Sequence, residues 1–513
     1  MRTLLLLLIV VQFACSGPQA PYGNLDPHQR AVTGGQVVGF SESGVDRWYG
    51  IPFATPPIGD LRWQAPQPVM PWDSIRSTKA FGPAAMQHNI WGDMQYRSDG
   101  FSEDCLYLNV WAPEGAKANL PVLLYYYGGG LMAGDGSETR YDGASMAREG
   151  MVVVTTNYRL NVFGFLAHPE LSAEAPYNAS GNYGHLDQVA ALEWVRNNIA
   201  GFGGDPSKIT IAGESAGAKS VSTVLTSPLS RKLIAGAIGE SGAAIKPTMY
   251  PIPLNEAEEV GTAFAKTIDA NTLSELRAVP ADSLYAHYLR AEVRFPTVLD
   301  GYLTTDQIEG TYTQGDVPNI PLLVGWNSQE MPPQVLLGKD MTTKNFVAQV
   351  KERMGPVADQ LLAVLPHSTD EEAIASATLL ASDGFISYAT WRWSDLHAKN
   401  IKAPTFRYLY DHARPGATGG APHAAEIPYA LGNLELHKTY EWEDADRNVS
   451  ATMKAYFANF IKTGNPNGEG LPKWTAVEAT DNTPSVMVIK EVSEEIEADD
   501  RRYPIEQSFH EGM

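Results

Sequence analysis

The sequence predicts an α/β protein with a large, mostly parallel central sheet that helices cover. Two apolar runs rich in β-branched and aromatic residues, 121–127 and 151–158, are typical of buried strands. Between 187 and 199, apolar residues recur at mostly three- and four-residue spacings, which indicates an amphipathic helix, and a third strand follows at 208–212. Strand, helix and strand in this order predict parallel pairing through helical crossovers.

Residues 1–17 have the pattern of a secretory signal peptide. The basic residue Arg2 precedes the apolar run 4–11, which is too short to span a bilayer, and small residues follow. We expect cleavage between about residues 14 and 20, and an exported protein, secreted or periplasmic, with no transmembrane segment. An N-terminal lipid anchor at Cys15 stays open, because Ala14-Cys15-Ser16-Gly17 resembles a lipoprotein signal although the residues before it fit that signal poorly.

The rest of the chain, 18–513, is predicted to form one domain with helical and loop insertions. No internal repeat and no Gly/Ser-rich linker divides it, and further strand patterns return at 321–325, 405–411 and 485–489. The 38 basic residues against 59 acidic ones leave a net charge of −21, which excludes a nucleic-acid binder that depends on a basic face. Of the two cysteines, Cys15 lies in the signal and Cys105 begins an apolar run, so no disulfide framework is expected.

Ser215 is the candidate nucleophile. It lies in the motif Gly213-Glu214-Ser215-Ala216-Gly217, directly after the third strand and before a stretch that can open a helix. A sharp strand-to-helix turn lifts such a serine above the edge of the sheet, and the two glycines let the backbone pack closely around it. This context distinguishes the motif from an ordinary glycine-rich turn.

A triple glycine, Gly128-Gly129-Gly130, follows the first strand and can supply oxyanion donors. Without side chains, the backbone N–H groups of Gly129 and Gly130 can approach a substrate oxygen, and the N–H of Ala216 points the same way from the helix start. A phosphate-binding loop is the alternative. Neither a Walker lysine nor a dinucleotide fingerprint accompanies these glycines.

Several further segments, in the same order as in a known family, identify a resemblance to the type-B carboxylesterases, which include the cholinesterases. The matching segments are Tyr49 to Ala54, Ser102 to Val110, Asn157 to Leu160, Gly181 to Gly184, Phe202 to Pro206 and Gly213 to Gly217. The resemblance implies the α/β-hydrolase fold for nearly the whole mature chain. It also implies a structural ion pair between Arg62 and Glu103.

The same resemblance completes a triad with Ser215. The residue that matches the catalytic acid of the family is Glu330, after the strand at 321–325, and the residue that matches the base is His423. Ser241 matches a serine that supports the triad. His412 is a rival base, but it closes a strand, whereas His423 follows a glycine-rich loop that can carry it over the sheet edge. His423 and Glu426 could instead form a His-x-x-Glu metal pair, but no second cluster adds ligands.

The expected function is hydrolysis of small to medium uncharged carboxylic esters through an acyl-enzyme, with no cofactor and no metal. Alternatives are an amidase that uses the same triad, and a non-catalytic adhesion-type member of the fold. Nothing in the sequence determines the oligomeric state or the natural ester. The acidic composition is expected to disfavour anionic esters.

Four departures from the family pattern lie near these motifs and leave the triad residues intact. Ala85 stands where many relatives carry the cysteine that would pair with Cys105, so that disulfide is absent. Ala218, Met331 and Leu131 replace residues common in the family next to the nucleophile, the acid and the triple glycine. The last three put the shape of the acyl pocket in doubt.

Overall fold

The structure is a computed structural model that describes residues 26–270, 272–417, 419–478 and 483–512. The signal peptide predicted at residues 1–17 and the lipidation signal at Cys15 lie outside the described residues. Within those residues, no helix is both long and apolar enough to cross a membrane.

A mixed sheet of eleven strands forms the centre of the described chain, in the order β18-β17-β16-β15-β12-β11-β9-β10-β8-β4-β3. The strands from β10 to β17 in this order pair in parallel, whereas β18 at one end and β8, β4 and β3 at the other pair antiparallel. The bounds are β3 Phe40–Glu42, β4 Val45–Pro52, β8 Tyr107–Pro113, β9 Leu120–Tyr126, β10 Val152–Thr156, β11 Gly204–Glu214, β12 Gly236–Glu240, β15 Leu322–Asn327, β16 Thr405–Tyr410, β17 Ser485–Ile489 and β18 Glu494–Glu497.

The central strands are buried on both faces, which explains their nearly continuous apolar sequences. Every residue of β10 and β15 is buried, as are the last five of β9. Three small sheets lie outside the large one. They consist of β1 Gln29–Val32, β2 Gly35–Val38 and β5 Ile75–Ser77; of β6 Ala84–Ala85 and β7 Phe101–Ser102; and of β13 Ile252–Pro253 and β14 Val298–Leu299.

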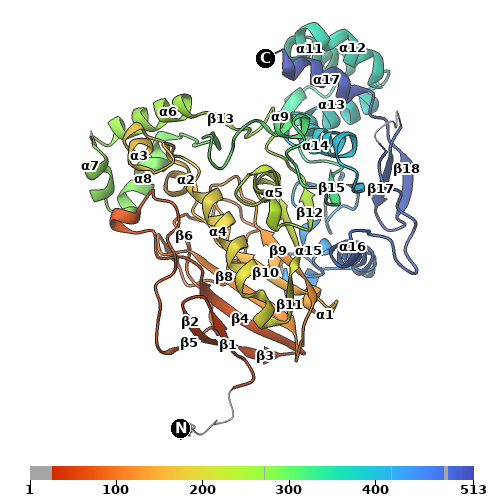
Figure 1. Cartoon of the computed structure of the whole chain (residues 1–513). Coiled ribbons are helices and arrows are strands. Elements are labelled where there is room, and N and C mark those ends of the chain that lie inside the picture. Colours follow the sequence, from red (N-terminus) through yellow and green to blue (C-terminus); the bar gives the residue numbers. More distant parts are fainter. Residues whose placement is uncertain (1–25, 271, 418, 479–482, 513) are drawn as a thin grey trace, which may run out of the picture.

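Helices pack against the sheet, and α4 and α5 cross in front of its strands in Figure 1. The predicted helix at 187–199 is α4, which begins earlier, at Tyr183. The first turn of this helix requires glycine at Gly184, because a Cβ there would lie 2.4 Å from the carbonyl oxygen of Arg159. The helices outside the two groups described next are α1 Ala144–Arg148, α2 Asn161–Phe165, α3 Pro169–Glu174, α4 Tyr183–Asn198, α5 Ala216–Thr226, α9 Ile308–Thr313, α14 Ser387–Asn400, α15 Ile427–Ala430 and α16 Asp444–Thr463.

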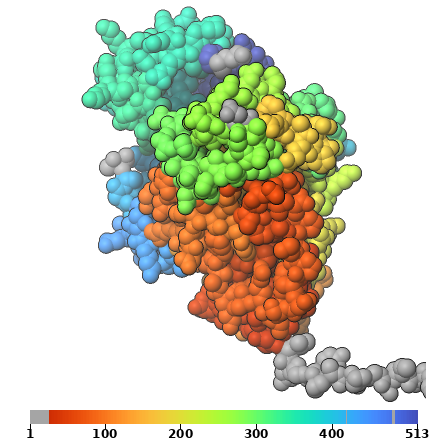
Figure 2. Space-filling model, turned by 90° about the vertical axis from the view of Figure 1, so that its left-hand side faces the viewer, coloured from red at the N-terminus to blue at the C-terminus, as the bar shows by residue number. Residues whose placement is uncertain are grey.

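Two further helical groups flank the upper part of the sheet in Figure 1. One consists of α6 Leu254–Thr267, α7 Leu273–Ala278 and α8 Ala281–Ala291. The other consists of α10 Gln334–Leu337, α11 Thr343–Met354, α12 Ala358–Val364, α13 Asp370–Phe385 and α17 Arg502–Glu511, and much of it forms an apolar cluster of its own. Figure 2 shows this second group as a teal lobe that projects from the end opposite the N-terminal strands.

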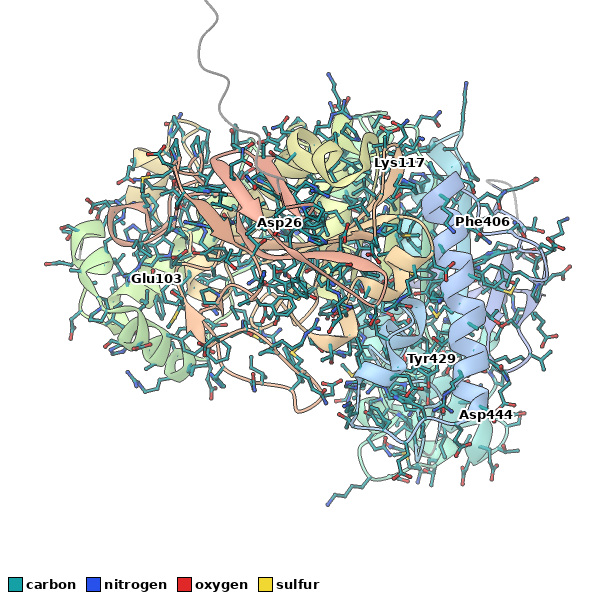
Figure 3. All side chains as sticks on the ribbon, turned by 90° about the horizontal axis from the view of Figure 1, so that it is seen from below. Asp26, Glu103, Lys117, Phe406, Tyr429 and Asp444 are labelled. Atoms are coloured by element: carbon teal, nitrogen blue, oxygen red, sulfur yellow. The ribbon has the colours of Figure 1, made fainter. Side chains whose placement is uncertain are left out.

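The ion pair implied for Arg62 and Glu103 is present, with two Arg62 nitrogens each 2.6 Å from a Glu103 oxygen. Arg62 also donates to the carbonyl oxygens of Arg277 and Val279, at and just after the end of α7. Figure 3 places Glu103 beside the green helices and far from Tyr429 and from Asp444 at the start of α16. The pair therefore ties the N-terminal region to the first helical group.

Candidate active site

Ser215 lies on the sharp turn between β11 and α5, as the sequence predicts. Its backbone angles, φ 56° and ψ −119°, are strained for a residue with a side chain. The two flanking positions require glycine, because a side chain at either would clash with neighbouring backbone atoms. A Cβ at Gly213 would lie 2.6 Å from the backbone of Gly217, and one at Gly217 would lie 2.1 Å from the carbonyl oxygen of Tyr126. The turn therefore holds the serine at the carboxyl end of β11.

Two loops at the same edge of the sheet bring His423 and Glu330 to this serine. Nε2 of His423 is 2.9 Å from Oγ of Ser215, and its Nδ1 is 2.6 Å from Oε2 of Glu330. Glu330 follows β15 and His423 follows β16, and these strands are parallel neighbours. The structure thus assembles the three residues in a hydrogen-bonded chain.

The second oxygen of Glu330 is also fully engaged. Its Oε1 accepts hydrogen bonds from Oγ of Ser241, at 2.6 Å, and from the backbone N–H of Asn327, at 2.7 Å. Ser241 follows β12, so it reaches Glu330 from the neighbouring strand. These donors leave the carboxylate a single orientation, with Oε2 toward the imidazole.

The loop that carries His423 is anchored to the loop that carries Glu330. The backbone N–H of Gln329 donates to the carbonyl oxygen of Ala421 at 2.9 Å, and the N–H of Ala421 donates to Oγ of Ser328 at 2.9 Å. The glycine-rich sequence suggested a loop that swings over the sheet edge. In the structure, one main-chain hydrogen bond and one main-chain to side-chain hydrogen bond hold the segment next to His423.

A second buried carboxyl group, Glu214, lies beside the imidazole. Its Oε1 is 3.3 Å from Nε2 of His423. Burial, reinforced by the Glu426 and Glu330 carboxylates, raises the pKa of Glu214 to about 8. For His423, burial lowers the pKa, but the charges of Glu214 and Glu330 together outweigh burial and raise it to about 9. Protonation of the base is therefore coupled to that of Glu214.

The backbone N–H groups of Gly129, Gly130 and Ala216 are available as donors beside Ser215. Within the described residues, none of the three donates a hydrogen bond to the protein outside regular helix and strand pairing. Gly129 has φ +111°, and a Cβ there would lie 2.1 Å from the carbonyl oxygen of Ala133. Only glycine fits this loop, which keeps the two N–H groups at the cavity that Ser215 also lines.

That cavity has a volume of about 650 Å³ and is mostly apolar. Its larger apolar lining residues include Trp91, Met94, Met132, Met249, Met331, Pro332 and Phe385. The ring of Phe385 stands nearly perpendicular to that of His423, with centroids 5.0 Å apart. A cavity of this size accommodates a small or medium organic substrate against the nucleophile.

Two alternatives from the sequence were His412 as the base and a metal pair of His423 and Glu426, and the structure gives these side chains other contacts. His412 is bound to Asp446 at 2.8 Å and lies outside the cavity lining. Glu426 accepts hydrogen bonds from Asn327 and Ser241 instead of facing a metal with His423. No group of three potential metal-ligating residues occurs among the residues that the structure describes. Cys105 is buried, and burial raises the pKa of its thiol, as expected for a packing residue.

Among the cavity residues that sequence reasoning did not single out are three charged ones near the nucleophile: Glu214, Lys219 and Arg294. Glu214 lies inside the nucleophile motif, and Lys219 follows Ser215 by four residues at the start of a helix, so both carried a local signal. Arg294 comes from a loop between α8 and β14 with no recognisable pattern. Burial, reinforced by the nearby charge of Arg294 and partly opposed by Glu214, lowers the pKa of Lys219 to about 7.

Comparisons with known proteins identify the family of the chain. Residues 26–504 match the carboxylesterase family. The chain belongs to this family. It is 37% identical to fumonisin B1 esterase of Sphingopyxis macrogoltabida over 88% of this chain and 84% of that protein. It is 35% identical to para-nitrobenzyl esterase of Bacillus subtilis (strain 168), over 88% and 92% of the two chains.

Solved carboxylesterase structures share the fold. A PNB esterase structure superposes with a TM-score of 0.80 at 30% identity and covers 94% of this chain and 99% of its own. A carboxylesterase of Geobacillus stearothermophilus reaches the same TM-score at 29% identity, over 93% and 99% of the two chains. The protein is therefore an α/β-hydrolase and a carboxylic ester hydrolase that acts on small-molecule esters.

Proposed function

We propose that this carboxylesterase cleaves its esters through a triad of Ser215, His423 and Glu330 and an acyl-enzyme intermediate. The observation that carries the proposal is the hydrogen-bonded chain from Oγ of Ser215 through both imidazole nitrogens to Glu330. Nucleophile, base and orienting acid in hydrogen-bond contact form the arrangement that serine hydrolases use on several unrelated folds.

In the proposed reaction, Nε2 of His423 takes the proton of Ser215 while Oγ attacks the ester carbonyl carbon. The N–H groups of Gly129, Gly130 and Ala216 stabilise the oxyanion. His423 then gives the proton to the departing alcohol, and a water molecule, deprotonated by the same imidazole, cleaves the acyl-enzyme and releases the acid. Glu330 holds the proton on Nδ1 and stabilises the imidazolium, and Ser241 supports Glu330.

The size and lining of the cavity support small to medium esters. The curated relatives are named for two unlike substrates, fumonisin B1 and para-nitrobenzyl esters, so similarity assigns neither the acyl nor the alcohol part. The expectation of uncharged substrates derives from the acidic composition of the whole chain.

The test is hydrolysis of 4-nitrophenyl butyrate and of the matching anilide by wild-type protein and two variants. Ser215→Ala should lower kcat by more than about 10⁴-fold, because the residual activity of a triad enzyme without its nucleophile comes only from binding and oxyanion donors. Glu330→Gln should lower kcat by about 10³- to 10⁴-fold with little change in KM, because it removes the charge that stabilises the imidazolium.

The control is Ser207→Ala, an exposed serine on the same strand, β11, as the nucleophile turn. It should react as the wild type does. An organophosphonate should label the peptide that contains Ser215 in the wild type and in Ser207→Ala. Full turnover by Ser215→Ala would refute the mechanism, and preferential cleavage of the anilide would favour an amidase.

We also propose export of the protein through its N-terminal segment, on the strength of the signal-like sequence alone. Expression of the full chain followed by N-terminal sequencing tests it. A new N-terminus near residue 17 is the expected result, and incorporation of fatty acid at Cys15 would indicate the anchored form. An intact N-terminus in the cytoplasm would contradict export.

A further inference from the structure

Lys219 is a buried cation in the active-site cavity and, within the described residues, its ammonium group has no hydrogen-bond or ion-pair partner. It lies in the first turn of α5, where its N–H donates to the carbonyl oxygen of Ser215 at 3.0 Å. The residue is only 4% exposed, and it lines the same cavity as Ser215. Across the described part of the chain, its Nζ has neither a hydrogen-bond acceptor nor a carboxylate within ion-pair distance. Buried charges are normally paired, because burial without a partner is unfavourable.

A second cation, Arg294, faces the same space from the loop between α8 and β14. It is solvent-exposed, and within the described residues it makes no ion pair or side-chain hydrogen bond. Lys219 is close enough to interact electrostatically with Arg294 and, more weakly, with Glu214. Two like charges in one cavity repel each other, so an anion between them would be stabilised by both.

The acidic groups of the cavity are engaged elsewhere. Asp93 forms ion pairs with Arg140, at 3.2 Å, and Arg414, at 3.7 Å. Glu330 binds His423, and Glu214 lies 3.3 Å from the same imidazole. Lys219 and Arg294 are therefore left for something that enters the cavity.

We propose that Lys219 and Arg294 form a carboxylate-binding subsite, and that the preferred substrates are esters bearing a second carboxylate group. This inference rests on the proposed function of Ser215. Lys219 lies in the first turn of α5, which begins directly after Ser215, and both line one cavity, so the subsite lies near the ester carbonyl. Met132 and Met249 line the space with them and would contact the chain that connects the two groups.

The net charge of the chain, −21, would by itself oppose the binding of anionic esters, since it should repel anions. Charges separated by more than about 8–10 Å in solvent are largely screened at physiological salt. Inside the cavity the nearest unpaired charges are positive, and interactions there are screened less. Local charge therefore outweighs the overall charge for a substrate already in the cavity.

Two pairs of esters test the proposal, each with one anionic and one neutral member. 4-Nitrophenyl hydrogen adipate and its methyl ester place the charge on the acyl side, and 3-acetoxybenzoate and its methyl ester place it on the alcohol side. The measurement is the kcat/KM of the anionic member of a pair divided by the kcat/KM of the neutral member. The wild type should favour the anionic member of at least one pair, which also shows on which side of the ester the subsite lies.

Lys219→Met should lower that ratio by about 10- to 100-fold, the effect of losing a charge-assisted hydrogen bond. Arg294→Gln should lower it less, because the residue is exposed, and Lys219→Arg should largely retain it. The matched control is Lys208→Met, which removes an exposed lysine on the neighbouring strand β11 and should leave the ratio unchanged. Free adipate should inhibit the wild type competitively and Lys219→Met much more weakly.

The pH dependence gives an independent readout. Because burial lowers the pKa of Lys219 to about 7, the ratio should fall as pH rises from about 6 to about 9, since Lys219 loses its proton. Both members of a pair share the titration of the triad, so the ratio isolates the subsite. In Lys219→Arg the preference should persist at high pH. The other titratable or charged groups that line the cavity are Asp93, Arg140, Tyr141, Glu214, Glu330 and His423.

Preference for the neutral member of both pairs by the wild type would overturn the proposal. So would equal ratios in the wild type and Lys219→Met, which would make Lys219 a structural residue. If Lys219→Met does not fold, the kcat/KM ratio of Arg294→Gln and the inhibition of the wild type by adipate test the proposal instead. Failure of the proposed function is distinguishable, since the folded protein would then hydrolyse neither member of either pair or would keep its activity in Ser215→Ala.

Discussion

Replacing Lys219 by methionine should make the protein more stable, and by an amount that depends on pH. The lysine side chain is buried with no hydrogen-bond or ion-pair partner in the described residues, whereas methionine has similar length and no charge. Burial lowers the pKa of Lys219 from 10.5 to about 7. Between these two values the unfolded chain binds a proton that the folded protein does not, so the stability of the wild type rises with pH across this window.

The expected size follows from that shift. The difference of 10.5 − 7 = 3.5 pKa units corresponds to about 5 kcal/mol, at about 1.36 kcal/mol per unit, and it is fully present at about pH 6. At about pH 9 only the 1.5 units below the unfolded pKa remain, which is about 2 kcal/mol. With an unfolding entropy of about 2.1 cal/mol/K per residue, a chain of this length should gain about 5 °C in Tm at pH 6 and about 2 °C at pH 9.

The assay is thermal unfolding of the wild type, Lys219→Met and the control Lys208→Met at both pH values, followed by circular dichroism. The gain in Tm of Lys219→Met over the wild type should shrink as pH rises, while Lys208→Met should track the wild type. A gain that is the same at both pH values would show that packing, and not charge, distinguishes the variant. A loss of stability at pH 6 would refute the reasoning, because it would mean that the buried ammonium has a stabilising partner.

Three further predictions concern the active site and the Arg62–Glu103 ion pair. Gly129→Ala should lower kcat by about 10²-fold or more, because its Cβ would displace the oxyanion loop, whereas Gly92→Ala, which meets no atom within 4 Å, should have little effect. Glu214→Gln should lower the pKa of His423 by removing a neighbouring negative charge, and the acidic limb of the kcat/KM profile should move to lower pH. Arg62→Met should reduce the free energy of unfolding by about 3–5 kcal/mol in denaturant titrations, because it leaves Glu103 buried without its partner, and kcat per folded molecule should not change.

Local sequence patterns were enough to predict the parallel strands and the nucleophile. The apolar runs became β9 and β10, and Ser215 lies on the turn from β11 to α5. Both features are encoded by residues close together in the sequence. A strand buried on both faces is a continuous apolar run, and the serine turn has glycines where a Cβ would clash. The antiparallel strands at both ends of the sheet were not predicted, because pairing at a sheet edge depends on segments distant in sequence.

Glu330 and His423 are a different case. The family resemblance supplied their positions, and the only local support was the glycine-rich loop before His423, which favoured it over His412. The structure brings them to Ser215 because β15 and β16 are parallel neighbours whose carboxyl ends meet at one edge. Adjacent parallel strands place residues far apart in sequence within hydrogen-bond distance.

By itself, the sequence determined the class of fold, the serine turn and, through its motifs, the kind of reaction, since each depends on short-range spacing or on segments in a known order. Only the tertiary structure decided the charge inside the cavity. Lys219 and Arg294 lie far apart in sequence, and whether a cation has a partner depends on every side chain that packs around it. The net charge of the chain sums over a screened surface, whereas a substrate interacts with the few unscreened charges that the fold places beside the nucleophile.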